Sequence, residues 1–200
     1  MLIKIDCYCD DIVNREGHAE LSLDFSSPST PYEFFGEHRV SFGCQISVKF
    51  LEKELGFYTV FGSYSLVNFI DGLKRLHTAL SGTAELFDEE NMTTIRFKVL
   101  DREHKVIGIS GAFGEYLRIP EGEAEDARQK TASSIASVVN VEGEYYLDGG
   151  NYAITTILQG LKTDHANLPE VIRQFKELLQ TSNSAQGQSQ YGGTLRLRSG

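Results

Sequence analysis

The feature that most constrains the fold is a run in which apolar side chains occupy every second position of residues 39–50. The apolar members of this run are Val40, Phe42, Cys44, Ile46, Val48 and Phe50. Because successive side chains of a strand point to opposite faces, the run predicts one long β-strand with one buried face. Gly43 lies inside the run and predicts a bend or a bulge in that strand.

The same alternation recurs along most of the chain. Further strands are predicted at residues 2–9, 18–25, 57–61, 84–87, 93–100, 106–113 and 152–161. A polar turn at residues 101–105 joins two neighbouring strands as a hairpin, so the sheet is expected to be largely antiparallel. Residues 135–141 and 145–147 are expected to form another hairpin, whereas residues 26–31 are rich in serine and proline and predict a loop.

Two segments instead have the period of a helix. Apolar side chains recur at every third or fourth position in residues 66–80 and again in residues 168–179. Each pattern predicts an amphipathic helix whose apolar stripe packs on the sheet. Strands and helices together predict an α+β fold, in which a largely antiparallel β-sheet or curled sandwich carries two amphipathic helices packed on it.

Polar residues mark the start of each helix. Ser63 or Ser65 is the expected N-cap of the first helix, since a serine hydroxyl accepts a hydrogen bond from the free N–H groups there. Asp164 and Asn167 are expected to do the same for the second helix. Asp164 is also followed directly by His165, which leaves an acid–base pair as the alternative interpretation of this dipeptide.

The length of 200 residues suits one domain with a hydrophobic core of its own. We expect this single domain to span residues 1–180. Residues 118–150 interrupt the strand pattern and predict an insertion, whose first part is acidic and almost free of apolar side chains. Residues 181–200 are polar and of low complexity, so they predict a flexible tail.

The chain carries 28 acidic and 19 basic side chains, for a formal net charge of -9. Nucleic acids and anionic membranes would repel such a chain, so neither is an expected partner, whereas a basic protein is. Neither a long apolar stretch that could span a membrane nor a signal peptide is recognised. The three cysteines, Cys7, Cys9 and Cys44, therefore suggest reduced thiols and a cytoplasmic location.

No sequence motif for catalysis or for a bound cofactor is recognised. A phosphate-binding loop and the HExxH zinc motif are both missing, and Cys7 and Cys9 lack two further ligands at zinc spacing. The five histidines are separate in the sequence: His18, His38, His77, His104 and His165. We therefore expect no catalytic residue, no cofactor and no metal site, and we interpret the chain as a non-enzymatic protein.

Two segments carry a resemblance to a known family. In residues 57–111 a strand and an amphipathic helix precede the sequence Gly-Thr-Ala-Glu-Leu, a strand that ends at Asp101, a turn with His104 and a strand that ends in Ser-Gly. Later, a strand leads into Thr-Asp-His-Ala-Asn-Leu-Pro at residues 163–169, directly before the last helix. This order resembles the WapI-type immunity proteins of bacterial polymorphic toxin systems and related bacterial families, whose motifs read G-x-A-x-L, D-x-x-G-H and T-D-Q-T-x-L.

The resemblance covers residues 57–117 and 152–180. The turn after Asp101 lacks the family's glycine, and His165 and Ala166 stand where the family has glutamine and threonine. The resemblance implies a cytosolic antitoxin that binds and neutralises a cognate toxin without catalysis. The acidity of the chain agrees with this, because an acidic inhibitor associates rapidly with a basic target such as a toxin nuclease.

Other functions stay open at this point. A small-ligand-binding or assembly β-module of a bacterial cytosolic protein is the main alternative, and an enzyme that uses dispersed Asp and His residues is a third. For an immunity protein, the charge pattern predicts toxin contacts at Glu115, Glu121, Glu123, Glu125 and Asp126. The sequence does not indicate an oligomeric state.

Overall fold

The computed structural model describes residues 1–10, 16–29, 32–34, 37–50, 53–90, 92–118, 139–147 and 151–190. The strands of its main sheet are β1 (Leu2–Asp10), β2 (Glu16–Pro28), β5 (Ser41–Phe50), β6 (Lys53–Gly62), β7 (Thr83–Phe87), β8 (Thr93–Asp101), β9 (Val106–Arg118), β10 (Val139–Leu147) and β11 (Asn151–Asp164). The other elements are β3 (Tyr32–Phe34), β4 (Glu37–Arg39), the helix α1 (Ser63–Ala79), the short 3-10 helix η1 (His165–Asn167) and the helix α3 (Leu168–Gln190). The predicted α+β class is therefore confirmed.

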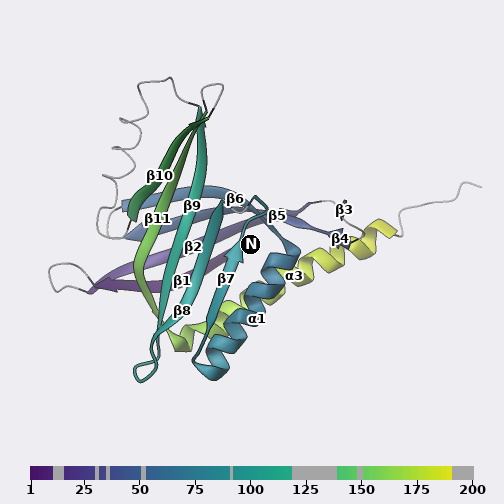
Figure 1. Cartoon of the computed structure of the whole chain (residues 1–200). Coiled ribbons are helices and arrows are strands. Elements are labelled where there is room, and N and C mark those ends of the chain that lie inside the picture. Colours follow the sequence, from purple (N-terminus) through teal and green to yellow (C-terminus); the bar gives the residue numbers. More distant parts are fainter. Residues whose placement is uncertain are drawn as a thin grey trace, which may run out of the picture.

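The main sheet is antiparallel and open. Its strand order is β6-β5-β2-β1-β11-β9-β8-β7, and β10 pairs with β11 beside this path. The strands β6 and β7 form the two ends of the sheet, while β3 and β4 form a separate two-stranded sheet. Figure 1 shows α1 and α3 side by side along one flank of the strands.

The strand β11 changes partner at a bend near Gly160. Before the bend it pairs with β10, and after it Lys162 lies opposite Tyr8 of β1. Gly160 has a φ of 81°, a left-handed conformation that glycine adopts easily, and the pairing with β9 shifts register between Leu158 and Leu161. Figure 1 shows the result: β9, β10 and β11 rise steeply, while β1, β2, β5 and β6 cross behind them.

The two helices close the hydrophobic core through aromatic contacts. The ring of Phe69 in α1 lies 5.5 Å from that of Phe97 in β8 and 5.2 Å from that of Phe175 in α3, between centroids. Phe175 also lies 5.9 Å from Phe25 of β2. All four rings are buried. Both helices therefore pack on the inner face of the sheet, against strands from both of its halves.

The long strand β5 forms as predicted, but Gly43 has a different role. The pairing of β5 with β6 runs through Gly43 without a shift, and the irregularity lies in β2, between Phe25 and Pro28. The extra residues lie in β2, so the predicted bulge of β5 at Gly43 is wrong, and β2 continues through Ser26, where a loop was predicted. A Cβ at Gly43 would approach the Tyr58 hydroxyl and Ser26 Oγ, so these two side chains would have to move to admit it.

The start of α1 also differs from the prediction. Gly62 is the N-cap, and no side chain makes a capping hydrogen bond there. The N–H of Ser63 donates to the carbonyl oxygen of Val40 at 2.8 Å, and Ser65 bonds to the backbone of Phe87 in β7. The helix start is therefore stabilised by neighbouring strands, and the prediction of a serine cap is wrong.

At the second helix one of the two predicted capping residues is confirmed. The carboxylate of Asp164 accepts a hydrogen bond from the Ala166 N–H at 2.7 Å. Asn167 does not cap, because its Nδ2 donates to Thr163 Oγ1 at 3.0 Å. The helix α3 then continues to Gln190, beyond the point where the sequence predicted a tail.

The strand β10 lies inside the segment predicted as an insertion. Its residues 139–147 form one strand that pairs with β11, so the predicted hairpin between residues 135–141 and 145–147 is wrong. Residues 119–138 and 148–150 lie outside the described part of the chain. The described part of this segment therefore extends the main sheet.

Candidate binding surface

The acidic residues predicted to contact a partner are only partly described. Glu115 lies in β9, with its Cα opposite that of Ile154 in β11, and its side chain is outside the described part. The other four lie outside the described residues: Glu121, Glu123, Glu125 and Asp126. Their role in binding therefore stays a prediction.

The turn between β7 and β8 contains a different acidic segment, residues 88–90, which begins with two residues held by hydrogen bonds. The Asp88 carboxylate accepts hydrogen bonds from Thr59 Oγ1 and from the Met92 N–H, each at 2.8 Å. The N–H of Glu89 donates to the carbonyl oxygen of Val60 at 3.0 Å. An aspartate favours a turn because its side chain bonds to nearby backbone N–H groups. Thr59 and Val60 belong to β6, so this turn joins the two ends of the open sheet.

Aromatic side chains are exposed beside this turn. The exposed fractions are 68% for Tyr58, 65% for Tyr64 and 38% for Phe87. Large aromatic side chains that are exposed together are typical of interaction sites. We define the corner surface as the set of Tyr58, Tyr64, Phe87, Asp88, Glu89 and Glu90.

Two hollows flank the turn, and Asp88 and Glu89 line both of them. One, of about 330 Å³, lies beside Tyr58 and Gly114 of β9, and the other, of about 370 Å³, lies beside Tyr64. Both are open to solvent, whereas a site for a small molecule usually encloses most of its ligand. The corner surface therefore suits contact with another protein better than capture of a small ligand.

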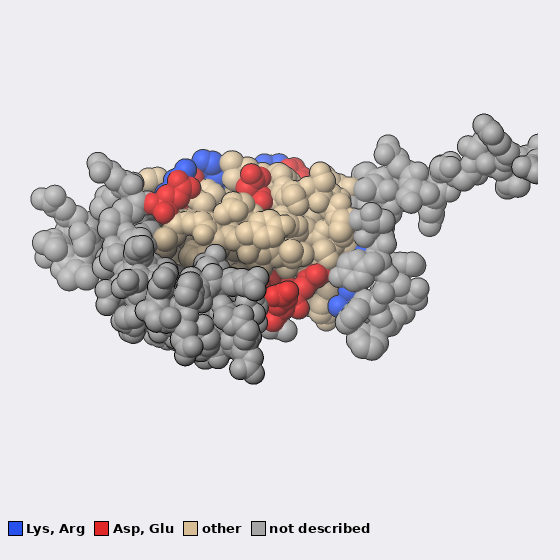
Figure 2. Space-filling model, turned by 90° about the horizontal axis from the view of Figure 1, so that it is seen from above, with Lys and Arg blue, Asp and Glu red and all other residues tan. Residues whose placement is uncertain are grey.

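Negative charge exceeds positive charge at the corner surface. Glu90 has no hydrogen-bond or ion-pair partner among the described residues, and Asp88 is bonded there only to neutral groups. Glu89 accepts a hydrogen bond from Ser41 Oγ at 2.5 Å, and Arg39 lines the hollow beside Tyr64. Figure 2, a view from above, shows the acidic side chains of the coloured residues in separate groups and most basic ones along one border. Asp88 is buried, so Glu90 is the exposed carboxylate here that lacks a described cation, and such a charge favours a basic over an acidic partner.

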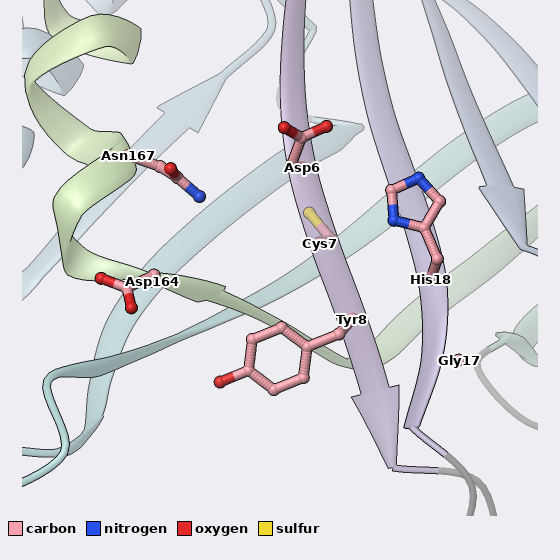
Figure 3. A pocket seen from close by; sticks show the side chains of 7 residues that line it. All are labelled: Asp6, Cys7, Tyr8, Gly17, His18, Asp164 and Asn167. Carbon is pink, nitrogen blue, oxygen red and sulfur yellow. The ribbon is translucent and has the colours of Figure 1, made fainter.

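A polar hollow between β1, β2 and the start of η1 is the strongest candidate for chemistry. Figure 3 shows the residues that line it: Asp6, Cys7, Tyr8, Gly17, His18, Asp164 and Asn167. Its polar groups hold the start of α3, because Asn167 Nδ2 donates to Thr163 Oγ1, which in turn donates to the Asp6 carbonyl oxygen at 2.7 Å. These hydrogen bonds therefore give Asn167 a structural role in this hollow.

The reactive side chains of this hollow do not combine into a catalytic arrangement. His18 lies on β2, on the far side of β1 from Asp164 (Figure 3). The Asp164 carboxylate is bonded to the backbone of Ala166. Burial raises the pKa of the Cys7 thiol to about 12, so it stays protonated near neutral pH, whereas a nucleophilic cysteine must be a thiolate.

The alternative interpretation of Asp164 and His165 as an acid–base pair is not supported, because the two side chains bond to different groups. The ring of His165 stacks on that of His77, with centroids 4.6 Å and planes 19° apart. Its Nε2–H donates to the carbonyl oxygen of His77 at 2.8 Å, and its backbone N–H donates to the carbonyl oxygen of Lys105 at 3.1 Å. Two histidines that are separate in the sequence therefore tie the end of α1 to η1.

Two of the motif residues that carry the resemblance, Asp101 and His104, lie in a turn that meets this contact. Asp101 accepts hydrogen bonds from the His104 N–H at 3.0 Å and from the His104 ring at 2.9 Å, and these bonds lower the pKa of Asp101. They close the turn between β8 and β9, which meets His165 through Lys105. The corner surface lies at the other end of α1 (Figure 1), so these motif residues stabilise the fold away from it.

Among the described residues, no group of His, Cys, Asp and Glu side chains is arranged to hold a metal ion. None of the described helices is both long and apolar enough to cross a membrane. No family model matches the chain, and no match was found among curated proteins or solved structures. The functional interpretation therefore rests on the corner surface.

Proposed function

We propose that this chain is an immunity protein that binds and neutralises a cognate bacterial toxin without catalysis, with the corner surface in its contact area. One observation carries the proposal: exposed aromatic rings flank carboxylates, of which Asp88 and Glu90 are balanced by no described cation. Aromatic rings supply much of the energy of protein interfaces, and complementary charge speeds association with the correct partner. A basic toxin has the chemistry that fits both features.

The hydrogen bonds that hold Asp88 and Glu89 support the same proposal. Asp88 and Glu89 are held by hydrogen bonds to Thr59, Met92 and Val60 before any partner binds. A surface that is ordered in advance loses less conformational entropy on binding, so more of the contact energy appears as affinity. The exposed Glu90 follows directly on this anchored segment.

The test is co-expression with the protein encoded by the adjacent gene, in cells whose growth that protein arrests. The wild-type chain should restore growth, and the double variant Tyr58→Ala with Glu90→Lys should restore much less. Glu103→Lys is the matched control, because Glu103 is an exposed acid in the turn at the other end of α1. Failure of the wild type to protect, or equal protection by the double variant, would contradict the proposal.

The acidic segment predicted from the sequence is tested separately. Reversing the charge of Glu121, Glu123 and Glu125 together should weaken binding to the purified toxin and flatten its dependence on salt. Unchanged affinity would remove this segment from the contact area. The result does not depend on the corner surface, which is tested by its own variants.

A further inference from the structure

One edge of the main sheet, that of β6, has few backbone partners among the described residues. The strand β6 pairs with β5 without a break, from Lys53 opposite Phe50 to Gly62 opposite Ser41. On its other side, the carbonyl oxygen of Val60 accepts the Glu89 N–H, as described above. Backbone groups of alternate residues point to the same side of a strand, so those of residues 54, 56 and 58 also point outward. Among the described residues they have no backbone partner.

The inner face of β6 is incompletely covered at the same place. Thr59 and Phe61 are buried, but Leu55 and Phe57 are only partly buried where they pack against the core. The ring of Phe57 stacks on Phe113 of β9 with centroids 4.4 Å and planes 9° apart. An additional strand beside β6 would cover both partly buried side chains and satisfy the outward N–H and C=O groups.

The turn beside the outer face of β6 carries negative charge, which favours a basic segment as the occupant of this edge. Tyr58 lines the hollow that also contains Asp88, Glu89 and Glu90. A lysine or arginine side chain from an added strand would meet the exposed ring of Tyr58 and the carboxylate of Glu90 in this hollow. The formal net charge of -9 opposes a second copy of the chain as the occupant, so a basic segment is favoured.

We infer that an extended, basic segment of a partner protein binds as an additional strand along the outer edge of β6, with one lysine or arginine in the hollow beside Tyr58. The inference rests on the proposed function, since it states how the toxin is held. Backbone hydrogen bonds supply affinity that does not depend on sequence, and the hollow supplies the preference for a cation. Because the Glu89 N–H already occupies the Val60 carbonyl oxygen, the added strand can pair only with the residues of β6 that precede Val60.

The probe is a fluorescent peptide of alternating lysine and valine, added to the full chain. It should bind with an affinity that falls as salt increases, and the amide protons of residues 54, 56 and 58 should exchange more slowly in its presence. A peptide of alternating glutamate and valine should not bind. Absence of added protection at these three amides would overturn the inference.

Gly56→Pro is the decisive variant, because it removes an outward N–H without removing a bond to β5. It should weaken peptide binding by about tenfold or more, the effect of losing one or two hydrogen bonds. Gly56→Ala is the matched control, since it keeps the N–H, and its Cβ would meet the flexible end of Gln45 closely and the Ile46 carbonyl oxygen at an ordinary contact distance of 3.9 Å. Equal binding by Gly56→Pro, in a chain whose unfolding is unchanged, would overturn the inference. A dimer of the wild type that Gly56→Pro abolishes would overturn the basic partner as occupant.

The same variants separate this inference from the proposed function. Full protection of growth by Gly56→Pro, together with loss of protection by Tyr58→Ala with Glu90→Lys, would overturn strand addition and leave the immunity function supported. Failure of the wild type to protect, together with amide protection by the peptide, would overturn the immunity function and leave strand addition supported.

Discussion

The two end strands of the sheet, β6 and β7, differ in how far the rest of the molecule covers their outer edges. The edge of β7 is covered by α1, where Ser65 Oγ donates to the Phe87 carbonyl oxygen at 2.6 Å and accepts the Phe87 N–H at 3.0 Å. The edge of β6 is bonded through Val60 alone among the described residues from 54 to 60. Proteins usually protect exposed edges, because an unprotected edge can pair with another chain. The comparison therefore shows that the described contacts cover the edge of β7 and leave most of the edge of β6 uncovered, which is the condition that the proposed strand addition needs.

A close approach of backbones makes the cover of β7 possible. Gly72 of α1 faces Ala84 of β7, and a Cβ at Gly72 would lie 2.8 Å from both the Cα and the Cβ of Ala84. A glycine is therefore required for the helix to lie at this distance from the strand. The helix could not cover the edge of β7 as closely with a larger residue there.

The largest effect is expected from removing the aromatic contact that holds both helices on the sheet. Phe175→Ala leaves a cavity between Phe25 and Phe69, and it should lower the free energy of unfolding by about 3–5 kcal/mol. Urea denaturation measures this change. Tyr64→Ala, at an exposed position, should change stability by less than about 0.5 kcal/mol. A small change in the free energy of unfolding for Phe175→Ala would show that the packing of α3 on the sheet contributes little to stability.

A smaller effect is expected from separating α1 from β7. Gly72→Ala places a methyl group against Ala84, and overpacking of this kind should destabilise the chain by about 1–3 kcal/mol. Arg75→Ala, on the exposed side of the same helix, is the control. The measurement is again urea denaturation. Equal stability of the two variants would contradict the close contact between α1 and β7.

Removing the hydrogen bonds on the β7 edge should make that edge resemble β6. Ser65→Ala leaves the N–H and C=O of Phe87 without their side-chain partner and should cost about 1 kcal/mol. The amide proton of Phe87 should then exchange with solvent faster, as measured by NMR. Thr78→Ala, in the last turns of the same helix, should leave this exchange rate unchanged.

The smallest effect concerns acid pH and the start of α3. Hydrogen bonds from Arg173 and Gln174 lower the pKa of Glu170 from 4.5 to about 2. Because the folded pKa is lower than the unfolded one, the stabilisation is complete above about pH 4.5 and is lost as the pH falls towards 2. The Tm difference between the wild type and Glu170→Gln should therefore shrink between pH 6 and pH 3. A Tm difference that stays constant over this pH range would contradict stabilisation by the charge of Glu170.

The local pattern predicted most of the strands and both helices. The alternation through Cys44 and Ile46 identified β5, and the helical spacing around Phe69 identified α1, because the side chains that alternate are those that the core buries. The contact that Ser65 makes instead of capping α1 was not predictable in this way. Ser65 bonds to Phe87, which is 22 positions away in the sequence.

The corner surface was missed for the same reason. Glu89 and Glu90 are adjacent acids in an acidic chain, and such pairs are ordinary surface residues in most proteins. Asp88 and Thr59 are 29 positions apart, so their hydrogen bond depends on how the sheet folds. Two local signals were present, namely the aspartate that directly follows Phe87 and the place of Tyr58 on the polar face of its strand.

The sequence by itself determined which segments become strands and helices, since the period of apolar residues is a property of neighbouring positions. The tertiary structure alone decided which edge of the sheet is covered. That choice depends on hydrogen bonds and close packing between segments far apart in the chain, such as Gly72 against Ala84 and Glu89 against Val60. The formal net charge of -9 follows from the composition, whereas the position of exposed carboxylates beside β6 follows from the fold.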